Sequence, residues 1–270
     1  MRSPLIWFGG KGRVAHEIIR RMPDHKVYVE PFGGAAHVLA QKPRVAHEVY
    51  NDIDGEVVNF LLVAQAEPER LASACENLPY SRELHQRWKR EPKPAGDFER
   101  AVRFFYLNRS TIAKGNAGHD SGWRHSVTPS GNPAKCYVNA CKVIKTFANR
   151  MKGVQIEHLD FRQIIQKYDR PETLFYIDPP YIGKEHHYAG GLRERDHRDL
   201  ANILNRIQGK ALVSYYDHPM LADLYPGWRR QTFSSYKQVV NGNNCQSEEL
   251  LLMNFQSEQL SLFENWDEVQ

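Results

Sequence analysis

Residues 174–181 read Leu-Phe-Tyr-Ile-Asp-Pro-Pro-Tyr, and this stretch decides the fold and the place of its chemistry. The four residues before the aspartate are apolar or aromatic, which predicts a buried strand. The two prolines cannot donate to a sheet ladder or continue a helix, so the strand must end at Asp178. Open α/β sheets bind ligands beyond the carboxyl ends of their strands. The stretch therefore predicts an α/β fold with a rigidly held carboxylate, prolyl carbonyls and a tyrosine ring at its functional edge.

The groups at this strand end suit an exocyclic amino group, which has two hydrogens to donate. The Asp178 carboxylate and the Pro179 carbonyl would accept those hydrogens, and the Tyr181 ring offers a face on which the attached base stacks. A plain surface loop is the alternative, but the preceding run is too apolar for an edge strand. Residues 178–181 also resemble the signature of S-adenosylmethionine-dependent methyltransferases that modify exocyclic amino nitrogens. This leaves adenine N6, cytosine N4 and protein glutamine open as targets, with Asp178, Pro179, Pro180 and Tyr181 as catalytic candidates.

The chain has 270 residues, enough for one domain with a large insert or for two small domains. Its hydrophobic content of 41% and charged content of 25% are ordinary for a globular protein. No apolar stretch approaches the roughly 20 residues that cross a bilayer, and the first residues lack the apolar region of a signal peptide. The four cysteines show no Cys-x-x-Cys pair and no zinc-type spacing with histidine. We therefore expect a cytoplasmic protein with reduced thiols, no bound metal and no membrane association.

Positive charge is concentrated in one part of the chain. Residues 80–152 hold 15 Lys and Arg against 5 Asp and Glu, whereas the whole chain has a net charge of only +4. The rest of the chain is therefore acidic. A solvated charged surface is the ordinary explanation of such a block, but an excess this large favours contacts with the phosphate backbone of a nucleic acid.

Glycine-rich turns predict a cofactor site near the N-terminus. The Gly-Gly-Lys at residues 9–11 is a weak signal alone, since the spacing of a P-loop is missing. Residues 27–30 predict a short strand, and the glycines at 33 and 34 would let a ligand approach the N-terminus of the next helix. Their spacing differs from G-x-G-x-x-G, which argues against a nicotinamide or flavin cofactor. Residues 48–54 predict a second strand that places Asp52 to accept bonds from ribose hydroxyls, while an Asx turn is the alternative for Asp54.

Four motifs in order, Trp7 to Lys11, Glu30 to Gly34, Asn51 to Ile53 and Asp178 to Tyr181, resemble the Dam family of DNA adenine-N6 methyltransferases. The resemblance covers at least residues 5–255. It implies transfer of a methyl group from S-adenosylmethionine to N6 of an adenine flipped out of double-stranded DNA. Glutamine methyltransferases lack this motif order, and cytosine-N4 enzymes usually carry serine in place of Asp178.

The same resemblance divides the chain into parts. It implies a Rossmann-like S-adenosylmethionine-dependent methyltransferase sheet with an inserted helical and β-hairpin target-recognition domain. The catalytic domain would comprise residues 1–56 and 145–255, the recognition domain residues 57–144, and a C-terminal tail residues 256–270.

The resemblance also assigns cofactor contacts. Residues 153–161 predict a strand that ends in Asp-Phe, where the family places the aspartate on the cofactor's adenine amino group and stacks the phenylalanine on its ring. The alternative is that Asp160 caps a helix at 161–168. The implied cofactor contacts are Trp7, Lys11, Phe32, Gly33, Gly34, Asp52, Asp160, Phe161 and Asp178.

The DNA-reading part falls within the basic block. An amphipathic helix at 98–108 leads, as in the family, to a segment at 110–135 rich in Gly, Ser, Asn and Pro, which suits a loop or β-hairpin that enters a groove. The segment departs from the enterobacterial Dam pattern, which has Phe-Asn-Val-Pro here, so a GATC target is not implied. A tight turn at 241–243 is also expected near the DNA. The DNA-binding candidates are Asn108, Arg109, Lys114, Arg124, Lys135 and Asn241.

The last residues predict a protein partner. The segment Gln259, Leu260, Ser261, Leu262 and Phe263 resembles the short peptide by which bacterial replication and repair proteins bind the polymerase sliding clamp. A mobile terminus would present these side chains to an apolar groove; the alternative is that they fold back onto the catalytic domain. A catalytically inactive DNA-binding protein of the same fold is the competing class for the whole chain, and the intact motif at 178–181 argues against it. We expect a monomer.

Overall fold

The computed structural model describes residues 1–112, 122–128, 131–183, 191–238 and 244–256. Within these residues the strands form one seven-stranded sheet in the order β3-β2-β1-β4-β5-β7-β6. The first five strands in that order are parallel, and β7 runs antiparallel to both of its neighbours. The strands are β1 (Val27–Glu30), β2 (His47–Asn51), β3 (Val154–Glu157), β4 (Thr173–Ile177), β5 (Lys210–Tyr215), β6 (Arg229–Gln238) and β7 (Asn244–Met253). This sheet confirms the predicted Rossmann-like α/β fold.

The predicted strand before Asp178 is β4, which lies between β1 and β5 near the middle of the sheet. All five of its residues are buried. Leu174 and Tyr176 belong to one apolar core, and Phe175 and Ile177 belong to another. Apolar layers therefore cover both faces of β4, which explains why its sequence is a continuous apolar run.

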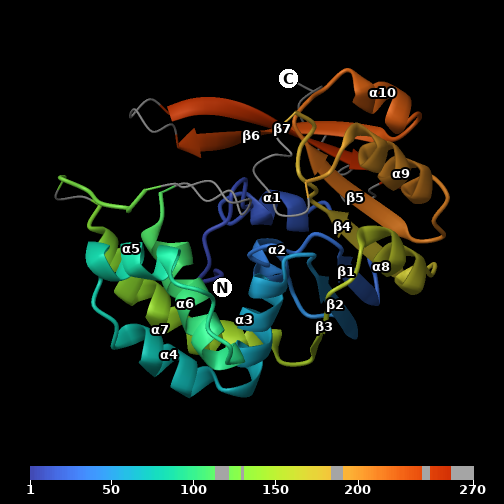
Figure 1. Ribbon diagram of the computed structural model, residues 1–270. Helices are drawn as coiled ribbons and strands as arrows, with labels where there is room; N and C mark the ends of the chain where they lie inside the picture. Colours follow the sequence, from blue (N-terminus) through green and yellow to red (C-terminus); the bar gives the residue numbers. More distant parts are fainter. Residues whose placement is uncertain (113–121, 129–130, 184–190, 239–243, 257–270) are drawn as a thin grey trace, which may run out of the picture.

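Helices cover both faces of the sheet (Figure 1). The core that contains Phe175 is completed by α8 (Phe161–Tyr168), α9 (Glu194–Leu204) and α10 (Met220–Leu224). The opposite core is completed by α1 (Ala15–Ile19), α2 (His37–Gln41) and the helices inserted between β2 and β3. The helix predicted at 161–168 is confirmed as α8.

The chain between β2 and β3 forms a separate group of helices, seen at the lower left of Figure 1. We call it the helical unit; it contains α3 (Gly55–Ala66), α4 (Pro68–Glu76), α5 (Arg82–Arg90), α6 (Asp97–Ser110) and α7 (Pro133–Met151). Its centre is aromatic, with the rings of Phe60 and Phe105 stacked at 5.7 Å. Because α7 runs unbroken past residue 144 and Phe147 and Met151 pack in the same core, the helical unit as defined here ends at Met151.

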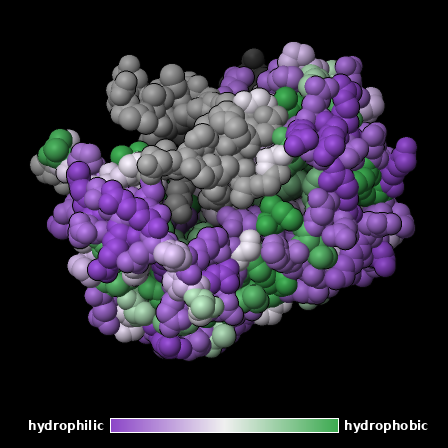
Figure 2. Space-filling model, in the orientation of Figure 1, coloured by the Kyte–Doolittle hydropathy of each residue, from purple (hydrophilic) through white to green (hydrophobic). Residues whose placement is uncertain are grey.

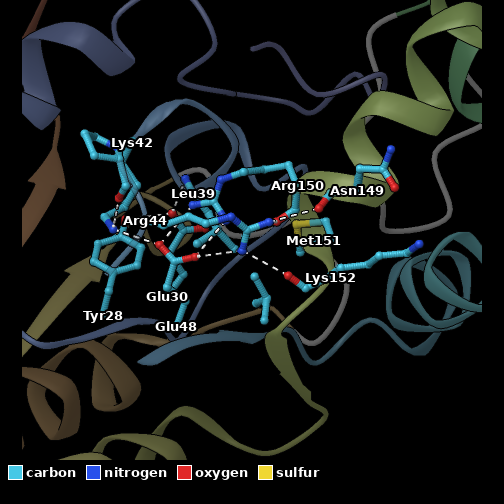
Figure 3. A network of polar contacts seen from close by, with 12 residues as sticks. Tyr28, Glu30, Leu39, Lys42, Arg44, Glu48, Asn149, Arg150, Met151 and Lys152 are labelled. Carbon is cyan, nitrogen blue, oxygen red and sulfur yellow. Dashed lines mark hydrogen bonds and ion pairs between the residues drawn. The ribbon is translucent and has the colours of Figure 1, made fainter. Parts of the chain in front are cut away.

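A cluster of charges, three of them largely buried and Arg44 exposed, attaches the end of α7 to the sheet (Figure 3). Glu48 of β2 accepts a hydrogen bond from Lys42 Nζ at 2.9 Å and two from the Arg150 guanidinium at 2.7 and 2.9 Å. Arg44 donates to the last carbonyls of α7 and of its cap, at 2.7 to 2.9 Å. We call Lys42, Arg44, Glu48 and Arg150 the Glu48 cluster. It joins the helical unit to β2 at the end opposite to the functional edge.

Candidate active site

A pocket opens beyond the carboxyl ends of β1, β2 and β4, at the edge that the sequence predicts. All predicted cofactor residues except Lys11 and Gly33 line it. The lining consists of Trp7, Pro31, Phe32, Gly34, Asn51, Asp52, Ile53, Asp54, Leu159, Asp160, Phe161, Arg162, Asp178, Pro180, Leu192 and Asp196. Residues from six separate stretches of the chain therefore meet in one concave site.

The turn after β1 shapes the pocket through its glycines. Gly34 has a φ of +47°, a left-handed conformation that favours glycine, and a Cβ there would lie 2.6 Å from the Trp7 indole nitrogen. A Cβ on Gly33 would lie 2.1 Å from the Tyr50 ring, whose hydroxyl donates to the Gly34 carbonyl at 2.7 Å. The two glycines thus let Trp7 and Tyr50 pack against opposite sides of the turn.

Asp52 is a buried carboxylate held by this turn. Its Oδ2 accepts a hydrogen bond from the Gly34 N–H at 2.7 Å, and its Oδ1 accepts one from the Asp54 N–H at 2.8 Å. Burial raises the pKa of the Asp52 carboxyl to about 6, although these two backbone bonds oppose the rise. The alternative for Asp54 is confirmed, because its carboxylate accepts from the Glu56 N–H and caps α3. Of the two carboxylates, Asp54 caps α3 and Asp52 does not cap a helix.

The segment after β3 forms the opposite wall. The Asn51 side chain bonds the backbone N–H and carbonyl of Leu159, so the chain leaves the sheet sooner than the predicted strand at 153–161. Asp160 caps α8 by accepting from the Arg162 N–H at 2.9 Å, as the capping alternative predicted, and it also lines the pocket. The Phe161 ring lies 5.5 Å from the Phe32 ring across the turn.

Arg162 is a pocket residue that the sequence analysis missed. Its guanidinium donates to Asp160, to Asp196 at 2.5 Å and to Asp199 at 2.7 Å. It therefore connects the start of α8 to the start of α9 beside the pocket. The signal was weak, since an arginine inside an amphipathic helix ordinarily faces solvent.

Asp178 follows β4 and presents its carboxylate to the pocket. Its Oδ1 accepts from Ser214 Oγ at 2.9 Å and from the Tyr181 hydroxyl at 3.3 Å, and it pairs with Lys11 Nζ at 3.0 Å. Ser214, on β5, is buried and also bonds the Tyr176 hydroxyl at 3.1 Å. None of the described residues donates a hydrogen bond to Oδ2. One carboxylate oxygen is thus occupied by the protein, and the other faces the site.

Lys11 lies at the Asp178 end of the site, not in the pocket wall where a cofactor contact was expected. Besides Asp178, its buried ammonium donates to the Gly9 carbonyl at 2.7 Å, lies 3.6 Å from Glu249 Oε2, and stands 4.9 Å from the centre of the Tyr181 ring. Burial lowers the pKa of Lys11, but the carboxylates of Asp178 and Glu249 outweigh burial and raise it above its ordinary value. Lys11 is therefore a cation held by two acids.

Two of the predicted DNA contacts make bonds within the protein. Asn108 is 1% exposed, and its amide both donates to the Ile6 carbonyl and accepts from the Ile6 N–H, each at 2.8 Å. Arg109 is half-buried and donates to the carbonyls of Pro4 and Cys136. Both side chains therefore hold the N-terminal segment that precedes Trp7.

The predicted loop or β-hairpin begins directly after α6. Thr111 and Trp123 form an antiparallel bridge, and the Arg124 N–H donates to the Ser110 carbonyl at 2.8 Å. The Trp123 ring packs 4.4 Å from the Tyr80 ring, which fixes the hairpin base on the helical unit. Arg124 is half-buried here and Lys135 is exposed at the start of α7, whereas Lys114 and Asn241 lie outside the described residues.

The visible surface of the helical unit is mainly hydrophilic (Figure 2). Exposed basic side chains on α5 contribute to it, namely Arg82, Arg87, Lys89 and Arg90. No helix in the described part of the chain is long and apolar enough to cross a membrane. The expected cytoplasmic location stays a prediction.

Comparison with known proteins identifies relatives over nearly the whole chain. Residues 7–241 match the family model of D12 class N6 adenine-specific DNA methyltransferases. The chain is 26% identical to the retron Ec67 DNA adenine methylase of Escherichia coli over 256 residues, which cover 88% of this chain and 86% of that protein. It is 24% identical to a DNA adenine methylase of Vibrio cholerae over 84% of this chain and 85% of that protein. It is also 29% identical to the DNA N-6-adenine-methyltransferase of Escherichia phage P1, over 83% of this chain but 31% of that longer protein.

Proposed function

Because the chain belongs to the D12 class of N6 adenine-specific DNA methyltransferases, its reaction is the methylation of adenine in DNA, and we propose that S-adenosylmethionine is the methyl donor. The observation that carries this proposal is that Asp52 and Asp178 line the same pocket. The rings of Phe32 and Phe161, which pack on each other and line the pocket, offer an aromatic surface for the cofactor's adenine, and Asp52 offers acceptors for ribose hydroxyls. The cofactor supplies an electrophilic methyl group when bound.

The target adenine would reach Asp178 only by leaving the duplex, at an unstacking cost of a few kcal/mol. The Oδ2 atom of Asp178 and the Pro179 carbonyl would then accept the two N6 hydrogens. These bonds localise the nitrogen lone pair, which ring conjugation otherwise withdraws, and aim it at the methyl group. Ser214, Tyr181 and Lys11 fix the carboxylate through its other oxygen, so the residues act by positioning and by their charge.

The test is to remove the proposed acceptor. Asp178→Asn and Asp178→Ala should abolish methyl transfer to duplex DNA, because neither keeps the carboxylate, while DNA binding stays largely intact. Asp223→Ala removes an exposed carboxylate on α10 and serves as the matched control. Transfer of labelled methyl groups would be measured together with DNA binding. Wild-type turnover of the Asp178 variants would overturn the proposed mechanism.

We propose that DNA contacts lie on the hairpin and the start of α7, through Lys114, Arg124 and Lys135. Each phosphate contact that is lost should reduce the slope of log affinity against log salt by roughly 0.9. Lys26→Gln is the control, because this exposed lysine precedes β1 at the opposite edge of the sheet. An unchanged slope in the triple Lys114→Gln, Arg124→Gln, Lys135→Gln variant would refute this assignment. Sequencing of modified bases in DNA from cells that express the chain would identify the target sequence.

A second proposal concerns partners. We propose that residues 259–263 bind the bacterial sliding clamp, which would raise the enzyme concentration on newly copied DNA, and that the enzyme is a monomer. These residues lie outside the described part of the structure, so the support is their sequence alone. Purified clamp should be retained by the full chain but not by a Leu262→Ala, Phe263→Ala variant. Absence of binding at tens of micromolar would refute it, and light scattering would test the monomer.

A further inference from the structure

We propose that Glu249 is a positioning residue of this active site, a second carboxylate that holds Lys11 beside Asp178 and offsets part of the lysine charge. This inference rests on the role proposed for Asp178 and adds a residue to it. Lys11 Nζ lies 3.0 Å from Asp178 Oδ1 and 3.6 Å from Glu249 Oε2. The side chains of Lys11 and Glu249 are 3% and 7% exposed, so water screens their attraction little.

The sheet topology explains how a residue so late in the chain reaches this site. Strand β7 runs antiparallel to β5, and Leu250 of β7 pairs with Tyr215, the last residue of β5. The residue before Leu250 therefore lies at the edge where the parallel strands end. An ordinary parallel strand would enter the sheet at the opposite edge. Because β7 runs antiparallel to β5, Glu249, which precedes Leu250, lies at the functional edge of the sheet.

The charges explain why a second carboxylate matters for the reaction. When adenine N6 gains a methyl group, the nitrogen carries positive charge until its proton leaves. Lys11 alone would neutralise Asp178 and disfavour that charge. An ionised Glu249 places a second negative charge beside Lys11, so the lysine charge is not directed at Asp178 alone. The site can then stabilise the charge that develops on N6.

Glu249 also limits where the lysine can lie. The Lys11 ammonium has a carbonyl acceptor on Gly9 and a carboxylate on either side. Without Glu249 it would be free to move farther over Asp178 and reach toward Oδ2, the oxygen proposed to accept from adenine. Competition between lysine and substrate for this oxygen would slow the chemical step without weakening cofactor or DNA binding.

The experiment removes the charge and keeps the shape. Glu249→Gln should lower kcat about 10- to 100-fold, while the KM for duplex DNA, the Kd for S-adenosylmethionine and the Tm stay near wild type. Glu248→Gln, at the exposed neighbouring position of β7, is the matched control. Wild-type kcat in Glu249→Gln, or a loss of activity that follows only a loss of folded protein, would overturn the inference.

A double variant shows whether Glu249 acts through Lys11. If it does, Glu249→Gln combined with Lys11→Met should turn over no more slowly than Lys11→Met alone, and a further tenfold loss would overturn the inference. If Glu249→Gln does not fold, the double variant can still be measured. It also lacks Lys11, the buried cation that would otherwise lose the Glu249 carboxylate. If the Glu249 variants behave like wild type, the proposed function still stands, because only active Asp178 variants would refute the proposed mechanism.

Discussion

Replacing Glu48 by glutamine removes the anion on which Lys42 and Arg150 converge. The side chains of Lys42, Glu48 and Arg150 are 1%, 3% and 10% exposed, so both cations would keep their buried positions with a neutral partner. Burial raises the pKa of Glu48, but the hydrogen bonds from Arg150 and Lys42 outweigh burial and lower it, so the carboxylate is ionised at neutral pH.

The expected loss of unfolding free energy is large. Breaking a buried ion pair by removing one partner costs about 3 to 5 kcal/mol, because an uncompensated charge remains in the interior. Domains are stable by only about 5 to 15 kcal/mol in total. At roughly 2 to 4 °C per kcal/mol for a chain of this size, Glu48→Gln should lower the Tm by roughly 10 °C.

The matched control is an exposed pair of the same chemistry. Glu67 and Arg70 are 43% and 58% exposed and lie 2.6 Å apart, so Glu67→Gln should cost less than about 1 kcal/mol. Urea unfolding of both variants, with thermal melts, would measure the difference. If Glu48→Gln lowered the free energy of unfolding no more than Glu67→Gln, the Glu48 cluster would not stabilise the attachment of the helical unit to the sheet.

Three further outcomes follow from the pocket and its surroundings. Burial raises the pKa of Asp52 to about 6, so affinity for S-adenosylmethionine should fall as the pH falls through this value, because protonation removes an acceptor. Calorimetric titration should show this pH dependence in the wild type and not in Asp52→Asn. Gly34→Ala should abolish cofactor binding, because its Cβ would meet Trp7, whereas Gly227→Ala has a similar positive φ with no atom within 4 Å of its Cβ and should still bind. Asn108→Ala should weaken cofactor binding through loss of both bonds to Ile6; a variant that lost only DNA affinity would restore the original assignment of Asn108.

Local signals in the sequence predicted the features that depend on neighbouring residues. The end of β4 at Asp178 follows from the two prolines, and the start of α8 at Phe161 follows from the cap at Asp160. Partners across the sheet were not predictable in this way. Ser214 and Glu249 reach Asp178 and Lys11 only through the strand order β4-β5-β7, which no local pattern in the chain specifies.

Asn108 shows why basic surroundings mislead. It stands beside Arg109 at the end of an amphipathic helix in a block rich in Lys and Arg, which favours a DNA contact. Its actual partner, Ile6, lies 102 residues earlier in the chain. The extended N-terminal segment needs acceptors and donors for its backbone, and a buried amide side chain satisfies one of each.

Two of the contacts between the helical unit and the rest of the molecule differ in their chemistry. At one, Asn108 of α6 holds Ile6, the residue before Trp7 and close to Lys11. At the other, the Glu48 cluster holds the end of α7 against β2. The hairpin base at Thr111 and Trp123 lies between α6 and α7 in the chain, so a force on the hairpin is shared by both contacts. The end of α7 cannot shift without disrupting buried charges, whereas the segment around Ile6 is held by two neutral hydrogen bonds from Asn108 and by the Arg109 guanidinium on the Pro4 carbonyl. Because Ile6 immediately precedes Trp7, which lines the pocket, a change in its two bonds to Asn108 would act directly on the wall of the active site.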